Sequence, residues 1–174
     1  DALPIWIQEY ENILIETSSY TLEDLKKMYR LSWVIQTFHS FGILECIAKY
    51  YQKTHEITLM KFYESILEYS QTNQTFFSNE CNLLEKHIEE GYSGKGWAHY
   101  DINLGDISWP FEEASVARFL KLDINILYKE INKFVEFFEN KIGVNSKTNV
   151  LSDLIKFQIF LLTTRDHLEE MQNE

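Results

Sequence analysis

The residues in this sequence that could bind a metal or transfer protons are few and widely spaced. The histidines are His39, His55, His87, His99 and His167, and none follows another at the three- or four-residue spacing of a helical metal site. The chain also lacks a Glu-x-x-His pair of the kind that di-iron helical bundles use. The sequence therefore predicts no helical metal centre of these kinds.

One loop gathers an imidazole and two carboxylates, because His99, Asp101 and Asp106 lie close together in the sequence. Such ligands suit a divalent cation. Single His and Asp residues in loops are more often solvated or cap a turn, so we favour a structural interpretation over a metal site. A catalytic site would require His39 to meet these three residues in one cleft, which we do not expect.

A nucleophile is equally hard to assign. Cys46 follows His39 by seven residues, which places both on one helical face only if the helix continues through Gly42. Because isoleucine and leucine flank Cys46 on both sides, we interpret it as an inert core thiol. The first turn after Pro110 contains Glu112 and Glu113, and the helix dipole explains these carboxylates without a role in catalysis.

The segment from residue 91 to residue 114 is the most unusual part of the chain. Its glycines at positions 91, 94 and 96 match neither nucleotide-binding fingerprint, and no strand is expected before them. Aromatic side chains in a long loop usually fold back onto the core, so we interpret the segment first as a structural clasp. It also offers a candidate partner surface, made of Tyr92, Trp97, His99, Tyr100 and Trp109.

Length and composition indicate a single globular domain spanning residues 1–174. A chain of 174 residues can bury a full core, and its 45% hydrophobic and 25% charged residues exclude a disordered protein. Six Gly and two Pro are too few for the many turns of an all-β sandwich. The aromatic content of 15% predicts a core rich in Phe and Tyr.

The charge balance narrows the possible partners. The chain has 16 Lys and Arg against 27 Asp and Glu, a net charge of −11, which repels nucleic acids and anionic membranes. No apolar run reaches the roughly 18 residues of a membrane-spanning helix. The two cysteines, Cys46 and Cys81, lie within apolar helical patterns and read as buried free thiols, which indicates a cytoplasmic protein.

Hydrophobic periodicity predicts an all-α fold, an irregular bundle of about six or seven helices with one long aromatic and Gly-rich loop. Residues 1–20 should be an irregular lead-in. Most helices have a recognisable start or stop. The first helix begins after a Thr21 cap and breaks at Gly42, the second covers residues 43–51, the third begins after a Thr58 cap, and the fourth covers residues 77–88 and stops at Gly91. The fifth has Pro110 in its first turn, and the sixth begins after an Asp123 cap and stops at Gly143.

Two expectations concern helix faces. The first helix should bury the side of Met28, Leu31, Ile35 and Phe38. The sixth helix should bury a stripe of Ile124, Leu127, Ile131, Phe134, Phe138 and Ile142. The last helix, about residues 149–171, is apolar nearly all round from Val150 to Leu162, so it should be central or pack against something outside the segment.

Two stretches also carry family-like patterns. The first, residues 20–67, has an acidic helix start, a tryptophan, an aromatic-His-Gly step and an aromatic pair: Thr21, Glu23, Asp24, Trp33, Phe38-His39-Ser40-Phe41-Gly42 and Phe62-Tyr63. It resembles the helical region that follows the catalytic barrel in cobalamin-binding radical S-adenosylmethionine proteins. The second, WPFEEASVARFL at residues 109–120, resembles a later helix start of the same region, and the helix containing Phe137 and Phe138 would follow it.

The resemblance implies a parent enzyme with an iron–sulfur cluster, S-adenosylmethionine and cobalamin. This sequence lacks both the Cys-x3-Cys-x2-Cys motif and the Asp-x-His-x-x-Gly motif of that family, so it assigns no catalytic, cofactor-binding or metal residue here. We expect a non-catalytic accessory domain, the C-terminal fragment of a longer protein, that packs on the catalytic barrel or on a protein partner. The alternative is a free-standing acidic helical module that binds a protein or a small apolar ligand.

Overall fold

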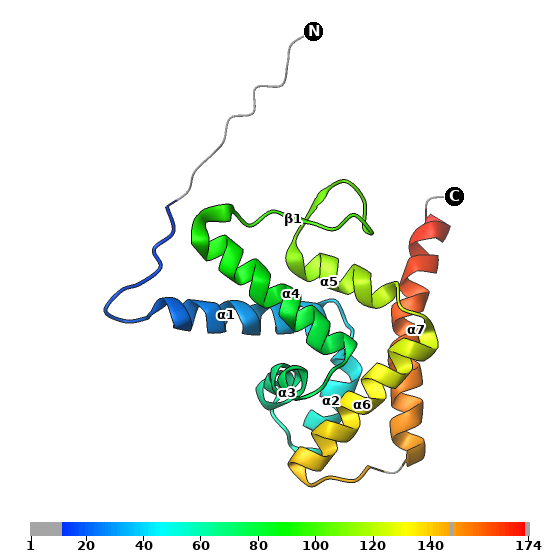
Figure 1. Cartoon of the computed structure of the whole chain (residues 1–174). Helices are drawn as coiled ribbons and strands as arrows, with labels where there is room; N and C mark the ends of the chain where they lie inside the picture. Colours follow the sequence, from blue (N-terminus) through cyan, green and yellow to red (C-terminus); the bar gives the residue numbers. More distant parts are fainter. Residues whose placement is uncertain (1–11, 147, 173–174) are drawn as a thin grey trace.

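The computed structural model describes residues 12–146 and 148–172, with side chains in the last helix described from residue 149 to residue 163. The predicted all-α irregular bundle is confirmed (Figure 1). Its elements are α1 (Leu22–Val34), η1 (Ile35–Ser40), α2 (Glu45–His55), α3 (Leu59–Thr72), α4 (Phe76–Glu90), η2 (Gly91–Lys95), β1 (His99–Tyr100), β2 (Ser108–Trp109), α5 (Phe111–Leu120), α6 (Ile124–Ile142) and α7 (Thr148–Gln172). The expected lead-in over residues 1–20 falls partly outside the described residues, and residues 12–20 are irregular.

Several helix boundaries lie where the capping residues predicted them. Thr21 begins α1 with a capping box in which its side chain and Asp24 exchange hydrogen bonds with each other's backbone N–H. Thr58 and Asp123 cap α3 and α6 through side-chain oxygens. Gly143 ends α6 in the left-handed conformation at φ 70°, which glycine adopts without steric cost.

The core is built mainly from aromatic rings, as the composition predicted. Phe77 of α4 stacks on Phe134 of α6, with ring centroids 5.7 Å apart, and on Phe38 of η1 at 5.4 Å. Phe62 of α3 meets Phe138 of α6 edge to face at 4.9 Å. All five rings are fully buried, so they join helices from both halves of the sequence into one core.

The predicted buried face of α1 is wrong at its start. Met28 is 64% exposed, whereas Trp33 and Val34 are buried and Tyr29 packs against the core. The reason is that Tyr29 and Trp33 lie four residues apart on one face of the helix. Tyr29 faces Trp97 in the segment between α4 and α5, and Trp33 faces Ser115 of α5, which rotates the buried side of the helix away from Met28. The chain then passes into the π-helical turn η1, which widens the helix before Gly42 ends it at φ 85°.

The predicted stop at Gly91 is confirmed for α4, which ends at Glu90 with Gly91 as its C-cap, but Gly91 does not turn the chain. Gly91 has helical dihedrals, and the chain continues through η2 until Gly94 turns it at φ 83°. Gly91 serves packing instead, because a Cβ atom there would lie 2.6 Å from the indole ring of Trp97. The following segment contains a two-residue antiparallel pairing, His99 with Trp109 and Tyr100 with Ser108, which periodicity could not reveal.

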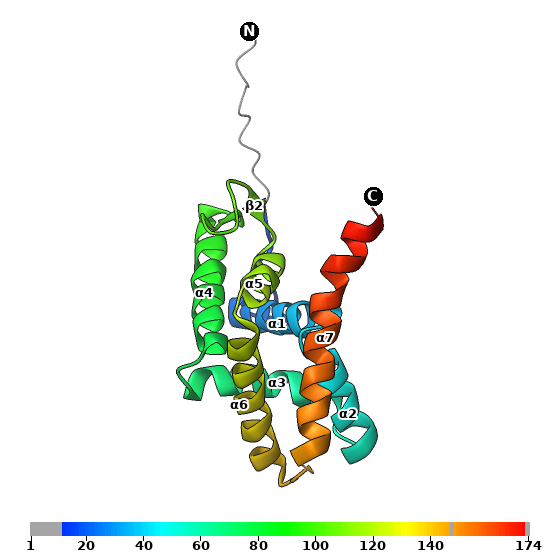
Figure 2. The same cartoon turned by 90° about the vertical axis from the view of Figure 1, so that its right-hand side faces the viewer.

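The last helix runs alongside α6 and α2 (Figures 1 and 2). Its inner side is buried through Leu151, Ile155, Gln158, Ile159 and Leu162. Gln158 accepts a hydrogen bond from the Cys46 backbone N–H at 2.7 Å and donates one to the Gly42 carbonyl, which closes the corner between η1 and α2. The outer side leaves Val150 and Phe157 exposed at 43% and 52%, so only one face of this apolar helix is packed within the chain.

The predicted buried stripe of α6 is wrong at Ile124. This side chain is 50% exposed, because the first turn of α6 is not covered.

Candidate functional site in the segment between α4 and α5

A buried ion pair lies beneath this segment. The Arg118 guanidinium of α5 donates to both carboxylate oxygens of Glu80 on α4, from Nε at 2.7 Å and from Nη2 at 2.9 Å. The Glu80 side chain is 2% exposed and that of Arg118 is 13% exposed. Two-point contact of this kind fixes the relative position of the two groups, so it holds α5 against α4.

Arg118 also contacts residues of the segment between α4 and α5. Its Nη1 donates to Asp101 Oδ2 at 3.1 Å and lies 3.2 Å from His99 Nε2. Its Nη2 donates to the Ser115 hydroxyl, which in turn accepts a hydrogen bond from Trp33 Nε1 at 3.0 Å. One cation therefore connects α1, α4, α5 and the chain that follows η2.

The contact with Arg118 determines the protonation state of His99. A guanidinium has only donors, so His99 Nε2 must accept, and the ring is neutral with its proton on Nδ1. Burial, and then the positive charge of Arg118, lower the pKa of His99 below its ordinary value. Burial likewise lowers the pKa of His87, whose ring stacks on Phe111 with centroids 4.7 Å apart.

Trp97 holds the other end of the segment. Its indole stacks on Tyr29 of α1 with ring centroids 5.0 Å apart, and it meets Tyr92 at 5.1 Å and His87 at 5.5 Å. The His87 Nε2 atom lies 3.2 Å from the Tyr29 hydroxyl, which links the two rings beneath the indole. Aromatic contacts of this number fit the clasp that the sequence suggested.

Beyond these anchored residues the chain forms an exposed tip at residues 100–107. The Asn103 backbone N–H donates to Asp101 Oδ1 at 2.9 Å, and the Lys121 ammonium donates to the Asn103 carbonyl. The tip nevertheless presents apolar side chains to solvent: Tyr100 is 68% exposed, Ile102 is 94% exposed and Ile107 is 55% exposed. Its backbone is held by hydrogen bonds while these three apolar side chains are largely exposed, which is the arrangement of a contact loop.

A cleft of about 630 Å³ separates this tip from α4. His87, His99 and Arg118 form its inner wall, whereas Tyr100 and Ile102 form its outer rim. These three polar groups already have hydrogen-bond partners: His87 contacts Tyr29, and Arg118 contacts both His99 and Glu80. They therefore offer little unsatisfied hydrogen-bonding capacity to a ligand. The cleft therefore suits contact with an apolar surface at its rim better than chemistry at its floor.

The structure divides the candidate partner surface predicted from the sequence. Tyr92, Trp97 and His99 are half-buried and anchor the segment, and Trp109 is half-buried with its Nε1 atom enclosed. Of the five predicted residues, only Tyr100 lies at the tip. The sequence did not reveal Ile102, because a single apolar residue between polar ones gives no periodic signal. It did not reveal Arg118 either, because the partners of Arg118 lie far away in the sequence.

The other predicted chemical residues lie apart from this segment or are exposed. His99 and Asp101 do meet, on Arg118, but Asp106 is exposed. His39 Nδ1 lies 2.7 Å from the Tyr63 hydroxyl of α3. Cys46 is a free, half-buried thiol, less enclosed than expected, and burial raises its pKa. Within the described residues no group of three or more His, Cys, Asp or Glu side chains could hold a metal ion.

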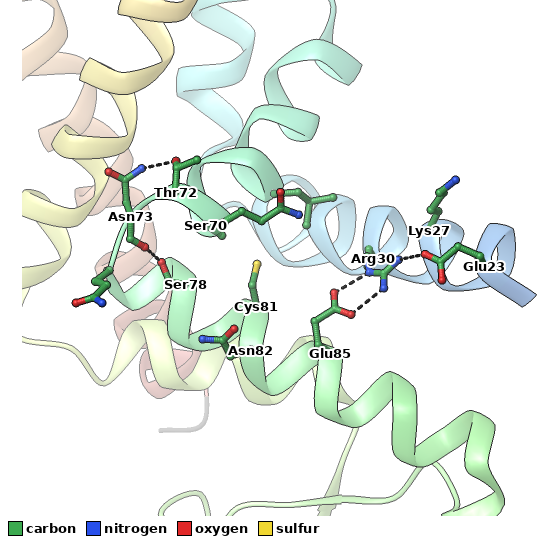
Figure 3. A pocket seen from close by; sticks show the side chains of 13 residues that line it. Glu23, Lys27, Arg30, Ser70, Thr72, Asn73, Ser78, Cys81, Asn82 and Glu85 are labelled. Carbon is green, nitrogen blue, oxygen red and sulfur yellow. Dashed lines mark hydrogen bonds and ion pairs between the residues drawn. The ribbon is translucent and has the colours of Figure 1, made fainter.

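A second, larger cleft of about 950 Å³ lies between α1, the end of α3 and α4 (Figure 3). At one end of the cleft Arg30 forms ion pairs with Glu23 and Glu85, so its guanidinium and these two carboxylates already have partners of opposite charge. The Cys81 sulfur faces into this cleft, but burial raises the pKa of the thiol to about 11. Cys81 is therefore a poor nucleophile near neutral pH.

Comparisons with known proteins assign no family. The chain matches no protein-family model, no curated protein and no solved structure. Among the described helices, none combines the length and the apolar character needed to cross a membrane. The geometry of the chain itself is therefore the basis for a functional proposal.

Proposed function

We propose that this chain is a non-catalytic accessory module of the cytoplasm that docks onto another protein through the tip at residues 100–107. The observation that carries the proposal is the 94% exposure of Ile102 on a segment anchored by the buried Arg118–Glu80 pair. An exposed apolar side chain on a flexible loop would lose much of its binding energy to ordering. An anchored loop loses less, because its backbone is already fixed.

The proposed partner has an apolar socket for Ile102 and Tyr100. A second copy of this chain fits poorly, because two molecules of net charge −11 repel each other. Interface hot spots are usually a few apolar or aromatic side chains at the centre of a contact, and the tip supplies such a set.

We propose further that this partner is the catalytic barrel of a cobalamin-binding radical S-adenosylmethionine enzyme, in the same chain or in another. In support, the two stretches that resemble that family lie together in the fold. Trp33 of the first donates to Ser115 of the second at 3.0 Å, and Phe38 meets Phe119 with ring centroids 5.3 Å apart. In this proposal the barrel binds the iron–sulfur cluster, S-adenosylmethionine and cobalamin, and this chain binds none of them.

Site-specific photo-crosslinking tests the proposal. The residue p-benzoylphenylalanine is introduced at position 102 in the native host, and crosslinked peptides are identified by mass spectrometry. We expect position 102 to crosslink to a polypeptide that carries a Cys-x3-Cys-x2-Cys motif. Met60, 46% exposed on α3, is the matched control and should give no such product.

Two results would overturn the proposal. Equal crosslinking from positions 102 and 60, or none from either, would remove the docking role of the tip. Stoichiometric binding of hydroxocobalamin or S-adenosylmethionine by this chain alone, measured by calorimetry, would contradict the non-catalytic assignment. A specific crosslink from position 102 to a protein without the motif would retain the docking surface and reject the radical-enzyme partner.

A further inference from the structure

An apolar groove of about 560 Å³ runs between the first turns of α6 and the middle of α7. Figure 2 shows these two helices side by side on one face of the bundle. Ile124 and Tyr128 of α6 line one wall, and Ile159 and Phe160 of α7 line the other. Its volume lies in the range of small-molecule sites.

The polar groups of this groove differ in whether they already have a hydrogen-bond or ion-pair partner. The Tyr128 hydroxyl and the Ser152 hydroxyl lie 3.3 Å apart and satisfy each other. Lys156 also lines the groove, and none of the ion pairs formed among the described residues includes it. The groove therefore combines apolar walls and neutral polar side chains, Asn125 and Thr163 among them, with one cation that forms no ion pair with the described residues.

We propose that this groove binds a small amphipathic carboxylic acid, with its aliphatic chain along Ile124 and Ile159 and its carboxylate on Lys156. The ammonium of Lys156 is what selects a carboxylate. The net charge of −11 repels anions over most of the surface, so binding of an anion here depends on this one local cation. This site is separate from the tip at residues 100–107, and its test does not depend on the docking proposal.

A matched pair of probes tests the inference: octanoate and octan-1-ol, titrated into the protein and followed by amide chemical shifts. We expect shifts that cluster at the groove, with octanoate binding about three- to fivefold more tightly than octan-1-ol, the contribution of an exposed ion pair. Lys156→Gln should abolish this preference and leave octan-1-ol binding unchanged. Lys129→Gln, an equal charge change on an exposed lysine of α6 outside the groove, should retain it.

Ile124→Ser provides a second check, because residue 124 is half exposed and its replacement should not prevent folding. It should weaken both probes equally. The proposal is overturned if octanoate produces no shifts at the groove, if octan-1-ol binds as tightly, or if the preference for octanoate survives in Lys156→Gln.

Discussion

The pair of Glu80 and Arg118 gives the sharpest test of how the segment between α4 and α5 is held. Glu80→Gln keeps the size of the side chain but leaves the buried guanidinium without its two-point carboxylate partner. Removing one member of a buried ion pair usually costs about 3–5 kcal/mol. Asp101 remains 3.1 Å from Arg118 Nη1 and offsets part of the loss, so we expect the lower end, about 3 kcal/mol.

The change can be measured by urea denaturation and by thermal unfolding. In a protein of this size each 1 kcal/mol shifts the Tm by roughly 2–4 °C, so Glu80→Gln should lower it by about 6–12 °C. Glu85→Gln is a matched control, because Glu85 also lies on α4 and also binds an arginine at two points, Arg30 Nε and Nη2. The Glu85 side chain is 44% exposed, and breaking so exposed a pair should cost less than about 1 kcal/mol.

Equal losses in the two variants would refute this reasoning, because burial would then not decide the strength of the pair. A loss below about 1 kcal/mol in Glu80→Gln would refute it as well. The double variant Glu80→Met, Arg118→Met should recover part of the loss, since it leaves no unpaired charge between α4 and α5. The recovery should be incomplete, because Asp101 then loses its ion pair with Arg118.

Three further predictions concern neighbouring groups. The folded-state pKa of His99 lies below its ordinary 6.5, so the unfolded chain binds more protons than the folded chain in acid. The free energy of unfolding should therefore decrease as the pH is lowered from about 7.5 to about 5.5. The accompanying fall in Tm should be smaller in His99→Gln. Trp97→Ala should lower the free energy of unfolding by about 2 kcal/mol, because the ring contacts of Trp97 are lost. Trp109→Phe should leave the free energy of unfolding unchanged or raise it by up to about 1 kcal/mol, because Trp109 Nε1 has no hydrogen-bond partner among the described residues. Urea titrations compare the two variants, and a large loss in Trp109→Phe would contradict the reasoning. Cys81, with its pKa raised to about 11, should react with iodoacetamide about ten- to a hundredfold more slowly near neutral pH in the folded than in the unfolded protein, and equal rates would show that folding does not raise its pKa.

The sequence predicts those parts of the fold that depend on neighbouring residues. Thr21, Thr58 and Asp123 cap helices because their side chains bond the backbone two or three residues ahead. The π-helical turn that follows the end of α4 at Gly91 could not be predicted in this way. The helical conformation of Gly91 and its close contact with Trp97 depend on packing across a turn.

The candidate site depends on contacts that sequence spacing cannot encode. Arg118 meets Glu80 across 38 residues, and Trp33 meets Ser115 across 82 residues. Neither pair belongs to a local motif. An arginine within the helix VARFL was the only available signal, because a charge on an apolar stretch needs a partner once it is buried.

The hydrogen bond from Cys46 to Gln158 bears on how the chain folds during its synthesis. Helix α2 has no side-chain cap at its start, and its Cys46 N–H finds its acceptor 112 residues later. At roughly 5–20 residues per second, a ribosome needs about 6–22 seconds to make that interval. During this time the Cys46 N–H in the first turn of α2 lacks the acceptor that it has in the finished fold. The first turn of α2 is therefore completed only when α7 has been made.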